Sequence, residues 1–349
     1  MSILERISGL VSKGEESMKY RILGKTGVQV SCLCMGTMLF GKETSEEASS
    51  EIFRRCREAG VNFFDTADAY NQGRSEEILG RLMGKEREEI VLASKVFFPM
   101  GADINASGLS RRRILSAVEA SLKRLQTDHL DLYFLHNYDP KTAMEEPLRA
   151  LDDLVRQGKI LYPAVSNWAA WQTAKALGIS ERVGLSRFEC LQLLYNLVKR
   201  QAEVELLPLA EAEKIGVMVY NPLGGGLLSG KYGLHKPQHG RLIDNPLYVK
   251  RYGDPVYFKI AEEFCAHAKE RGVHPASLAI AWVMSHPAVT APVMGARNLE
   301  QLNASLGALE IQMTPEWRAE ISALSIEPPP GTDRSEEKGG TFYLGKKTL

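Results

Sequence analysis

Four ionisable residues lie at or just beyond the ends of apolar stretches, and together they could protonate an oxygen atom. Asp65 ends the run that begins at Val61, and Tyr70 follows five residues later. Lys95 ends a second run (VLASK) and His136 ends a third (LYFLH). An ammonium group lowers the pKa of a neighbouring phenol from about 10, a carboxylate keeps that ammonium charged, and an imidazole can orient a carbonyl. We therefore expect Asp65 to anchor Lys95, and Lys95 to lower the pKa of Tyr70.

Each of the four residues also has an ordinary structural interpretation. Asp65 could cap the turn that follows it, and Tyr70 could be an exposed amphipathic ring. Lys95 could be a solvated strand end, and His136 could be a core histidine with satisfied hydrogen bonds. The catalytic interpretation is favoured because all four residues fall at the same end of adjacent apolar runs.

Eight apolar runs of β-forming character are mostly separated by helix-type patterns. Continuous apolar strands that alternate with helices predict a parallel sheet covered on both faces. Eight such units in roughly 300 residues fit a closed (β/α)8 TIM barrel, for which about 250 residues is typical, and an open doubly wound sheet is the alternative. The runs are CLCMG (32–36), VNFF (61–64), IVLAS (90–94), LDLYFL (130–135), ILYPAV (160–165), FECLQLL (188–194), GVMVY (216–220) and TAPVM (290–294).

Further polar residues belong to the same strand ends. Catalytic residues of a (β/α)8 barrel gather where its strands end at their carboxyl sides. Ser166 and Asn167 follow the fifth run, Gln192 lies within the sixth, and Tyr220 ends the seventh. The barrel hypothesis therefore places hydroxyl and amide groups beside the four ionisable side chains.

Two segments outside the eight units have recognisable patterns. The stretch 19–31 (KYRILGKTGVQVS) has Gly27 between two short β-forming runs, which predicts a hairpin that plugs the bottom of the barrel. The stretch 221–253 is rich in glycine, proline and basic residues and predicts a long loop after the seventh strand. Long loops in compact domains are usually functional, so we expect this loop to have a functional role.

The remaining sequence predicts one domain with two appendages. We expect a flexible N-terminal extension at 1–17, a single barrel domain at 18–325 and a polar tail at 326–349, because the tail is too rich in proline, glycine and charge to form a core. Apolar residues within 3–11 keep a helical spacing, which leaves a homo-oligomer open.

Composition and charge exclude several classes of partner. The chain has 349 residues, of which 44% are apolar and 25% charged, as in ordinary soluble proteins. Lys plus Arg and Asp plus Glu both number 43, so no net charge draws nucleic acid or an anionic membrane. The chain has no apolar run long enough to span a bilayer, and we expect its N-terminus to be a poor secretion signal. Its 5 cysteines form no CxxC pair. We expect a cytoplasmic protein with no membrane or nucleic-acid partner.

From Lys19 to about Leu324 the sequence resembles the aldo-keto reductase superfamily, in its bacterial and potassium-channel β-subunit branch. The most distinctive segment is FDTADAYNQGRSEEILG (64–80). Three others are VSNW (165–168), VYNPLGGGLLSGKY (219–232) and GARNLEQL (295–302). Four motifs in the family's order make chance similarity hard to sustain. The family's four catalytic residues fall on Asp65, Tyr70, Lys95 and His136.

The resemblance implies reduction of a small aldehyde or ketone by NADPH, without metal. Hydride would pass from nicotinamide C4 to the carbonyl carbon while Tyr70 protonates the oxygen. Tyr220 would support the nicotinamide ring and its amide would be held by Ser166, Asn167 and Gln192. The expected cofactor contacts are Gly36, Thr37, Asp65, Ser166, Asn167, Gln192, Tyr220, Asn221, Pro222, Leu223, Gly224, Lys231, Arg241, Gly295, Arg297 and Gln301.

The substrate would lie against Tyr70, His136 and Trp168. Aromatic residues commonly line such sites, but Trp168 and Trp171 open a helix pattern and could serve only in packing.

Three basic residues are candidates for binding the phosphate groups of the cofactor. The stretch 225–232 nearly matches a P-loop but has Tyr232 where Ser or Thr would bind Mg²⁺, and the chain has no GxGxxG motif. The glycine-rich turn with Lys231 and Arg241 could instead wrap a pyrophosphate. Arg297, at the start of a helix pattern, is the candidate for the adenosine 2′-phosphate. Both arginines could alternatively be plain surface charges.

Two departures from the family pattern concern the cofactor. Close relatives often have Glu-Asn where this chain has Ala304-Ser305, and this change could weaken adenine binding or alter cofactor preference. Asn221 replaces a common serine, which we expect to be tolerated.

His235 and His239 lie four residues apart around Pro237, without a third ligand nearby, so we expect no metal site.

Two other functions remain open. A regulatory subunit could keep the barrel and the cofactor but turn over little, as the potassium-channel β subunits of the superfamily suggest. A lyase or isomerase could use the same acid–base residues without nicotinamide, although the segments 219–232 and 295–302 speak against it.

Overall fold

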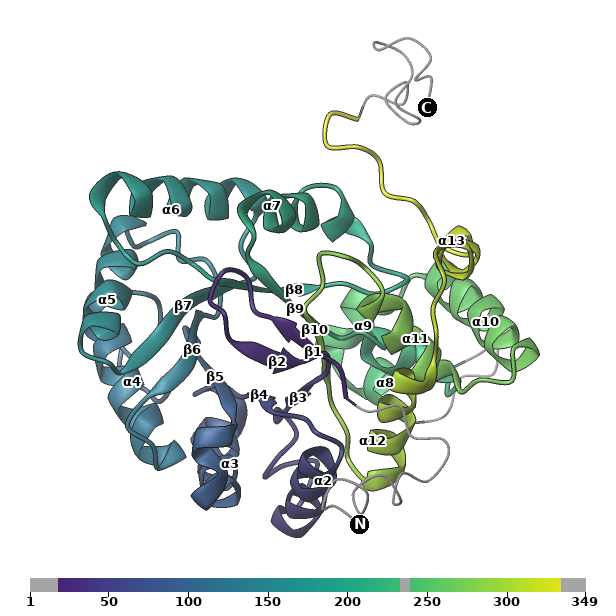
Figure 1. Cartoon of the computed structure of the whole chain (residues 1–349), viewed down its shortest axis with the longest axis horizontal. Helices are drawn as coiled ribbons and strands as arrows, with labels where there is room; N and C mark the ends of the chain where they lie inside the picture. Colours follow the sequence, from purple (N-terminus) through teal and green to yellow (C-terminus); the bar gives the residue numbers. More distant parts are fainter. Residues whose placement is uncertain (1–17, 233–238, 334–349) are drawn as a thin grey trace, which may run out of the picture.

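The computed structural model describes residues 18–232 and 239–333, and its main feature is a closed barrel of parallel strands (Figure 1). The order around the ring is β10-β3-β4-β5-β6-β7-β8-β9, so strands adjacent in sequence are paired and β10 closes onto β3. This confirms the predicted (β/α)8 barrel and excludes the doubly wound sheet. The strands are β3 Cys34–Gly36, β4 Phe63–Asp65, β5 Val91–Val96, β6 Leu130–Leu135, β7 Ile160–Ser166, β8 Cys190–Leu194, β9 Gly216–Tyr220 and β10 Ala291–Met294.

Helices surround the barrel (Figure 1) and separate its strands along the chain. None of the helices in 18–232 and 239–333 is both long and apolar enough to cross a bilayer. The α-helices are α2 Glu46–Glu58, α3 Arg74–Met83, α4 Arg111–Leu125, α5 Glu145–Arg156, α6 Ala170–Val183, α7 Leu206–Glu213, α8 Arg241–Asp244, α9 Pro246–Tyr252, α10 Pro255–Glu270, α11 Pro275–Met284, α12 Leu299–Leu306 and α13 Pro315–Ala323. The 3₁₀ helices are η1 Tyr70–Gly73, η2 Gly84–Glu89, η3 Gln201–Glu203, η4 Gly224–Ser229 and η5 Gly307–Glu310.

The strands separate two hydrophobic clusters. Side chains of alternate residues fill the barrel interior, as Phe63 and Phe134 do, and the residues between them pack outward against the helices, as Phe64 and Tyr133 do. Successive side chains of a strand point to opposite faces, so both faces of each strand must be apolar. This explains why the strands appear in the sequence as continuous apolar runs.

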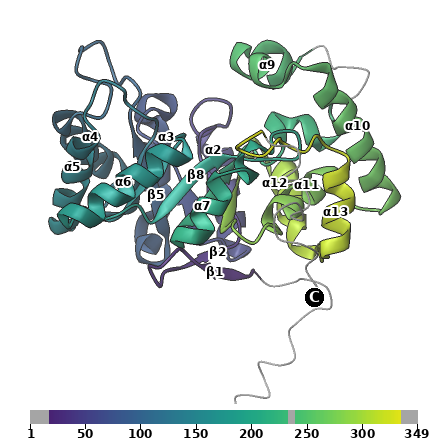
Figure 2. The same ribbon diagram turned by 90° about the horizontal axis from the view of Figure 1, so that it is seen from above.

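A hairpin closes the N-terminal end of the barrel, as predicted. Strands β1 (Tyr20–Ile22) and β2 (Gln29–Ser31) pair antiparallel, and Figure 2 shows them on the side opposite α9. The fully buried Leu23 joins the interior cluster. Gly24 fits so closely that an added Cβ would lie 3.0 Å from both the Glu189 carbonyl oxygen and the Gly216 nitrogen, at the starts of β8 and β9. The turn of the hairpin therefore inserts into the N-terminal end of the barrel.

The segment after β9 is more regular than the predicted loop. It contains η4, α8 and α9, and residues 233–238 lie outside the described part of the chain. Asn245 caps α9 by accepting a hydrogen bond from the Leu247 nitrogen at 3.1 Å, and Pro246 occupies the first helical turn. The predicted extension at 1–17 and residues 334–349 of the predicted tail also lie outside the described residues.

Candidate active site

Strand alternation brings the predicted ionisable residues to the inside of the barrel. Val91 and Ala93 belong to the interior cluster, so Lys95, two residues further along β5, continues the same face. Asp65 follows Phe63 on β4 in the same way, and His136 follows Phe134. Tyr70 lies on the turn after β4, in η1. The inward alternation of the strands thus positions three of the four predicted residues.

The four side chains converge around the Lys95 ammonium group. Lys95 Nζ donates to Asp65 Oδ2 at 2.7 Å, to the Thr66 carbonyl oxygen at 2.7 Å and to the Tyr70 hydroxyl at 3.2 Å. These three acceptors satisfy every proton of an ammonium group that is 0% exposed. The His136 ring stands edge-on to the Tyr70 ring, with 5.8 Å between centroids. Asp65, Lys95 and Tyr70 thus form a hydrogen-bonded chain beside an imidazole.

The pKa values differ in part from the expectation. Burial alone would lower the pKa of Lys95, but Asp65 and then Tyr70 raise it above its ordinary value, so the ammonium stays charged. Burial raises the pKa of Tyr70, and this effect outweighs Lys95, which lowers it. The prediction that the pKa of Tyr70 falls below its ordinary value was therefore wrong. The phenol holds its proton at neutral pH, and Lys95 makes losing that proton less unfavourable.

His136 is held as a neutral imidazole. Its side chain is 8% exposed, and burial, followed by the charge of Lys95, holds its pKa well below the ordinary value. Its Nδ1 has no hydrogen-bond partner among the described residues. The Phe98 ring packs edge-on against it, with 4.9 Å between centroids. A neutral imidazole can donate a hydrogen bond to a carbonyl oxygen but is not an acid at neutral pH.

Gln192 contacts the carboxylate of Asp65. Its Nε2 donates to Asp65 Oδ1 at 2.8 Å, from the opposite side of the barrel. The two oxygens of Asp65 therefore have different partners, Lys95 on one and Gln192 on the other. Sequence reasoning assigned Gln192 only to the nicotinamide amide and missed this contact, for which the sequence carries no local signal.

The predicted amide-binding residues form their own cluster at the mouth. Asn167 Nδ2 donates to the His136 carbonyl oxygen and to Ser166 Oγ, both at 3.0 Å. The Tyr220 hydroxyl donates to Asn167 Oδ1 at 2.7 Å. Asn167 and Asn221 both have a left-handed backbone, with φ of 60° and 54°. Asparagine tolerates this conformation better than serine, which explains the Asn221 substitution noted in the sequence.

The turn after β9 depends on three consecutive glycines. Residues 224–226 have φ of 60°, 70° and 103°, a conformation that other residues rarely adopt. An added Cβ on Gly225 would lie 2.7 Å from a carbon of the Tyr248 ring. Asn221 leads into this turn, and its Nδ2 is buried without a partner among the described residues. The Gly224 and Gly226 nitrogens donate within the turn, to the Asn221 and Leu223 carbonyl oxygens, so the Asn221 amide nitrogen is the group here that a ligand could satisfy.

Two residues of α9 reach the site and were missed from the sequence. The Arg251 guanidinium lies over the Tyr220 ring, with Cζ 5.9 Å from its centroid, and 5.7 Å from that of Tyr248. The ring of Tyr248 also lies 5.1 Å from Cζ of Arg241. The asparagine cap and Pro246 could have indicated a helix within the predicted loop, but its approach to Tyr220 depends on tertiary packing.

The three basic residues predicted to bind phosphate have side chains that reach solvent. Lys231 and Arg297 are exposed, Arg241 is half-buried, and none of the three forms an ion pair with a described residue. Gln301 Oε1 accepts from the Arg297 nitrogen at 3.1 Å, beside the N-cap of α12. Ser305 is buried and donates to the Gln301 carbonyl oxygen at 3.0 Å.

Other predicted contacts belong to the framework. The Thr37 hydroxyl is buried and bonded to the Asp65 carbonyl oxygen and to Ser75 Oγ, at 3.2 and 2.8 Å. An added Cβ on Gly36 would lie 2.6 Å from a Val293 methyl group, so glycine permits β3 to approach β10. Gly295 is exposed at the end of β10, whereas Pro222 is buried and Leu223 is half-buried ahead of η4.

Trp168 packs within the outer hydrophobic cluster. It is 5% exposed, and its ring lies edge-on to Tyr138 and Phe188, with 5.2 and 5.6 Å between centroids. This environment favours a role for Trp168 in core packing over a role in contacting the substrate. Trp171 is 60% exposed, with its ring 6.4 Å from that of Tyr138.

His235 lies outside the described residues, and the exposed His239 has Nδ1 3.6 Å from Asp244 Oδ1. Within the described part of the chain, no three His, Cys, Asp or Glu residues are grouped as metal ligands would be.

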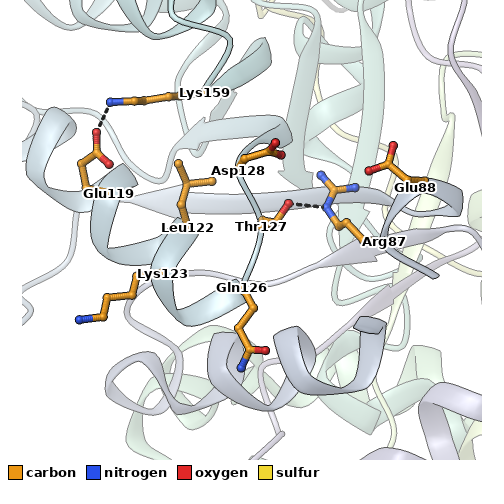
Figure 3. Close-up of a pocket in the computed structure, with 9 residues that line it drawn as sticks. All are labelled: Arg87, Glu88, Glu119, Leu122, Lys123, Gln126, Thr127, Asp128 and Lys159. Atoms are coloured by element: carbon orange, nitrogen blue, oxygen red, sulfur yellow. Dashed lines mark hydrogen bonds and ion pairs between the residues drawn. The ribbon is translucent and has the colours of Figure 1, made fainter. Parts of the chain in front are cut away.

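An open hollow lies at the N-terminal end of the strands, away from the residues described above. Figure 3 shows it between η2 and α4, with charged side chains on both walls. Arg87 Nε donates to Thr127 Oγ1 at 3.0 Å, and Lys159 pairs with Glu119. The hollow is open, and among the residues that line it Lys159 and Glu119 pair with each other, whereas Arg87 pairs with Asp131 and Asp128 contacts His129.

Comparison with known proteins identifies a family. A sequence model described as "Aldo/keto reductase family" matches residues 32–326. An "Uncharacterized oxidoreductase YrpG" of Bacillus subtilis (strain 168) is 37% identical over 337 residues, covering 91% of this chain and 99% of that protein. Two proteins named "Probable voltage-gated potassium channel subunit beta" are also similar. The one from Arabidopsis thaliana is 36% identical over 84% of this chain and 92% of its own length, and the one from Oryza sativa subsp. japonica is 33% identical over 90% and 99%.

Proposed function

The chain belongs to the aldo/keto reductase family, and on that premise we propose that it reduces an aldehyde or ketone to an alcohol with NADPH. The observation that carries the proposal is the hydrogen-bonded chain from Asp65 through Lys95 to Tyr70, with neutral His136 beside it. Such a group suits protonation of an oxygen that gains negative charge. The relatives extend over almost the same length, and one is named an oxidoreductase.

The residues present fit a phosphorylated dinucleotide. The left-handed glycines 224–226 carry no side chain towards a ligand, and the buried Asn221 amide nitrogen has no partner in the described residues. Lys231, Arg241 and Arg297 supply positive charge without an ion pair to any described carboxylate. We assign Lys231 and Arg241 to the pyrophosphate and Arg297 to the 2′-phosphate, because guanidinium groups bind phosphate in a forked geometry.

The mechanism follows from the protonation states of the chain's own groups. A bound nicotinamide would supply the hydride, held through Tyr220, Ser166 and Asn167. Tyr70 retains its proton until a substrate oxygen becomes basic enough to take it. Lys95 then stabilises the resulting phenolate across the 3.2 Å hydrogen bond, and Asp65 keeps the ammonium in place. Neutral His136 can donate a hydrogen bond that orients the carbonyl oxygen.

NADPH absorbance with a panel of aldehydes and ketones tests the proposal. We expect consumption by the wild-type protein and its loss in Tyr70→Phe, which keeps the ring but removes the proton donor. Turnover that persists in Tyr70→Phe would contradict the assignment. We propose a cytoplasmic location for this activity, consistent with five free cysteines, four of which are buried.

A regulatory function is the second candidate, because two relatives are named potassium channel subunits beta. In that case the protein would bind NADPH tightly but consume little of it. Binding measured by NADPH fluorescence, beside turnover across the same panel, separates the two functions. Tight binding with negligible turnover of every compound would favour the regulatory subunit.

A further inference from the structure

The chain turns in an unusual way directly after Tyr70. Asn71 and Gln72 have φ of 51° and 54°, and Gly73 has φ of 87°, so three consecutive residues are left-handed. Glycine adopts this conformation readily and asparagine tolerates it, but a long side chain such as glutamine rarely does. Such a turn persists only if its surroundings hold it.

The Asn71 side chain connects the turn to an earlier segment of the chain. Its Nδ2 donates to the Phe40 carbonyl oxygen at 2.7 Å and to the Met38 carbonyl oxygen at 3.1 Å. Both protons of the amide are therefore used on the segment that follows β3. Gln72 is exposed, and its side chain forms no hydrogen bond within the described residues, so it contributes nothing comparable.

The segment that accepts these hydrogen bonds is itself held by burial and by further hydrogen bonds. The Phe40 side chain is fully buried in the outer hydrophobic cluster, and its nitrogen donates to the Thr37 carbonyl oxygen at 2.9 Å. Ser75 Oγ donates to the same carbonyl at 2.7 Å, and Thr37 donates its backbone N–H to the Asp65 carbonyl oxygen at 2.9 Å. Asn71 is thus connected through the chain to the strand that carries Asp65.

Tyr70 itself contacts Lys95, whose Nζ lies 4.8 Å from the centroid of its ring, and its carbonyl oxygen accepts from the Arg74 nitrogen within the turn. Its nitrogen donates to the Ala67 carbonyl oxygen at 3.1 Å, and its hydroxyl accepts the 3.2 Å hydrogen bond from Lys95, the longest of the three that Lys95 makes. The ring is half-buried and meets His136 only edge-on. These contacts involve either Lys95 itself or the turn, so the backbone on the C-terminal side of Tyr70 helps to set the path of the ring towards Lys95.

We propose that Asn71 is a positioning residue that holds the left-handed turn and so keeps the Tyr70 hydroxyl on Lys95. The inference rests on the proposed function, in which Tyr70 donates the proton. Loss of the amide would let the turn relax, and a proton donor displaced by about 1 Å can lose on the order of 100-fold in rate.

The test compares Asn71→Gly with Gln72→Gly. Both variants place glycine at a left-handed position of the same turn, so neither adds backbone strain, but only the first removes hydrogen bonds to Met38 and Phe40. Asn71→Asp is a third variant that keeps the size and the turn preference but sets a carboxylate against two carbonyl oxygens. Turnover is measured with the aldehyde that the wild-type protein reduces fastest.

We expect kcat of Asn71→Gly to fall on the order of 10- to 100-fold, with a larger solvent isotope effect because proton transfer becomes slower. Asn71→Asp should lose at least as much. NADPH affinity should change little in both, because the expected phosphate ligands lie elsewhere. Gln72→Gly should retain kcat within about twofold of wild type, since it breaks no hydrogen bond. Thermal unfolding of each variant separates positioning from loss of folded protein.

Two results would overturn the inference. One is an Asn71→Gly variant with wild-type kcat and isotope effect while Tyr70→Phe is inactive, an outcome that leaves the proposed function intact. The other is independent of activity: a crystal structure of Asn71→Gly in which the Tyr70 hydroxyl still lies within hydrogen-bond distance of Lys95 Nζ. Turnover that is equal in the wild-type protein and in Tyr70→Phe would instead count against the proposed function.

Discussion

Gln192 Nε2 donates a 2.8 Å hydrogen bond to Asp65 Oδ1, so the carboxylate that holds Lys95 is itself held from across the barrel. The two residues are 127 positions apart in sequence. Gln192 on β8 therefore orients the Asp65 carboxylate on β4, and that carboxylate in turn holds the Lys95 ammonium group on β5.

The first prediction concerns this contact. Gln192→Leu leaves Asp65 Oδ1 buried without its donor, which should reduce the free energy of unfolding by ~1–3 kcal/mol. Chemical denaturation measures the loss, and Gln192→Asn provides a variant that keeps the amide on a shorter side chain. A fully stable Gln192→Leu protein would show that Asp65 does not depend on this bond.

Lys95→Met should lower kcat far more than it weakens NADPH binding. Methionine has a similar volume but no charge to stabilise a Tyr70 phenolate, so we expect a loss on the order of 100-fold or more in kcat. Steady-state kinetics and NADPH fluorescence titration measure the two quantities. Unchanged turnover would mean that the proton comes from another group.

The depressed pKa of His136 makes a prediction about acid stability. The folded protein keeps this imidazole neutral, whereas the unfolded chain protonates it near pH 6.5, so the unfolded state binds more protons below that pH. The fold should therefore lose up to ~1.4 kcal/mol per pH unit from this residue as the pH falls below 6.5. Denaturant midpoints between pH 7 and 5 should fall less in His136→Gln, and parallel curves would contradict the assignment.

Asp68 should act in the opposite direction. Arg113 Nη2 donates to its Oδ2 at 2.5 Å, yet burial raises the pKa of the carboxyl to about 6. The folded state then binds more protons than the unfolded chain between pH 4 and 6, so this contribution to stability is present at low pH and is lost as the pH rises to 6. A pKa raised by about 2 corresponds to ~3 kcal/mol.

The control for Asp68 is Asp68→Asn, which has the same shape but does not titrate. The difference in unfolding free energy between wild type and variant should shift by most of this amount between pH 7 and pH 3, in favour of the wild type at the lower pH. A difference that stays constant with pH would show that the carboxyl remains ionised.

Arg297→Ala should weaken NADPH binding more than NADH binding. The arginine is assigned to the additional phosphate, and a charge-assisted hydrogen bond contributes ~1.5–3 kcal/mol, or about tenfold or more in affinity. Dissociation constants for both nucleotides measure the difference. Equal losses for NADPH and NADH would remove the assignment.

The sequence predicted much of the fold because the relevant signals are local. All eight barrel strands lie at the predicted apolar runs, since strands buried on both faces must be apolar at every position. The hairpin was predicted from a different local signal, Gly27 between two short β-forming runs. The short helices α8 and α9 were missed because glycine, proline and charge in 221–253 suggested a loop, although Asn245 and Pro246 form a helix start.

The sequence by itself determined which side chains face the barrel interior, because strand alternation carries Asp65 and Lys95 along the same face as the apolar residues before them. Only the tertiary structure decided what those side chains experience. The pKa of Tyr70 rises because burial outweighs the neighbouring ammonium, and burial is a property of the whole fold. The bonds from Gln192 to Asp65 and from Asn71 to Phe40 likewise join segments that closure of the barrel brings together, over sequence distances at which the chain carries no local pattern.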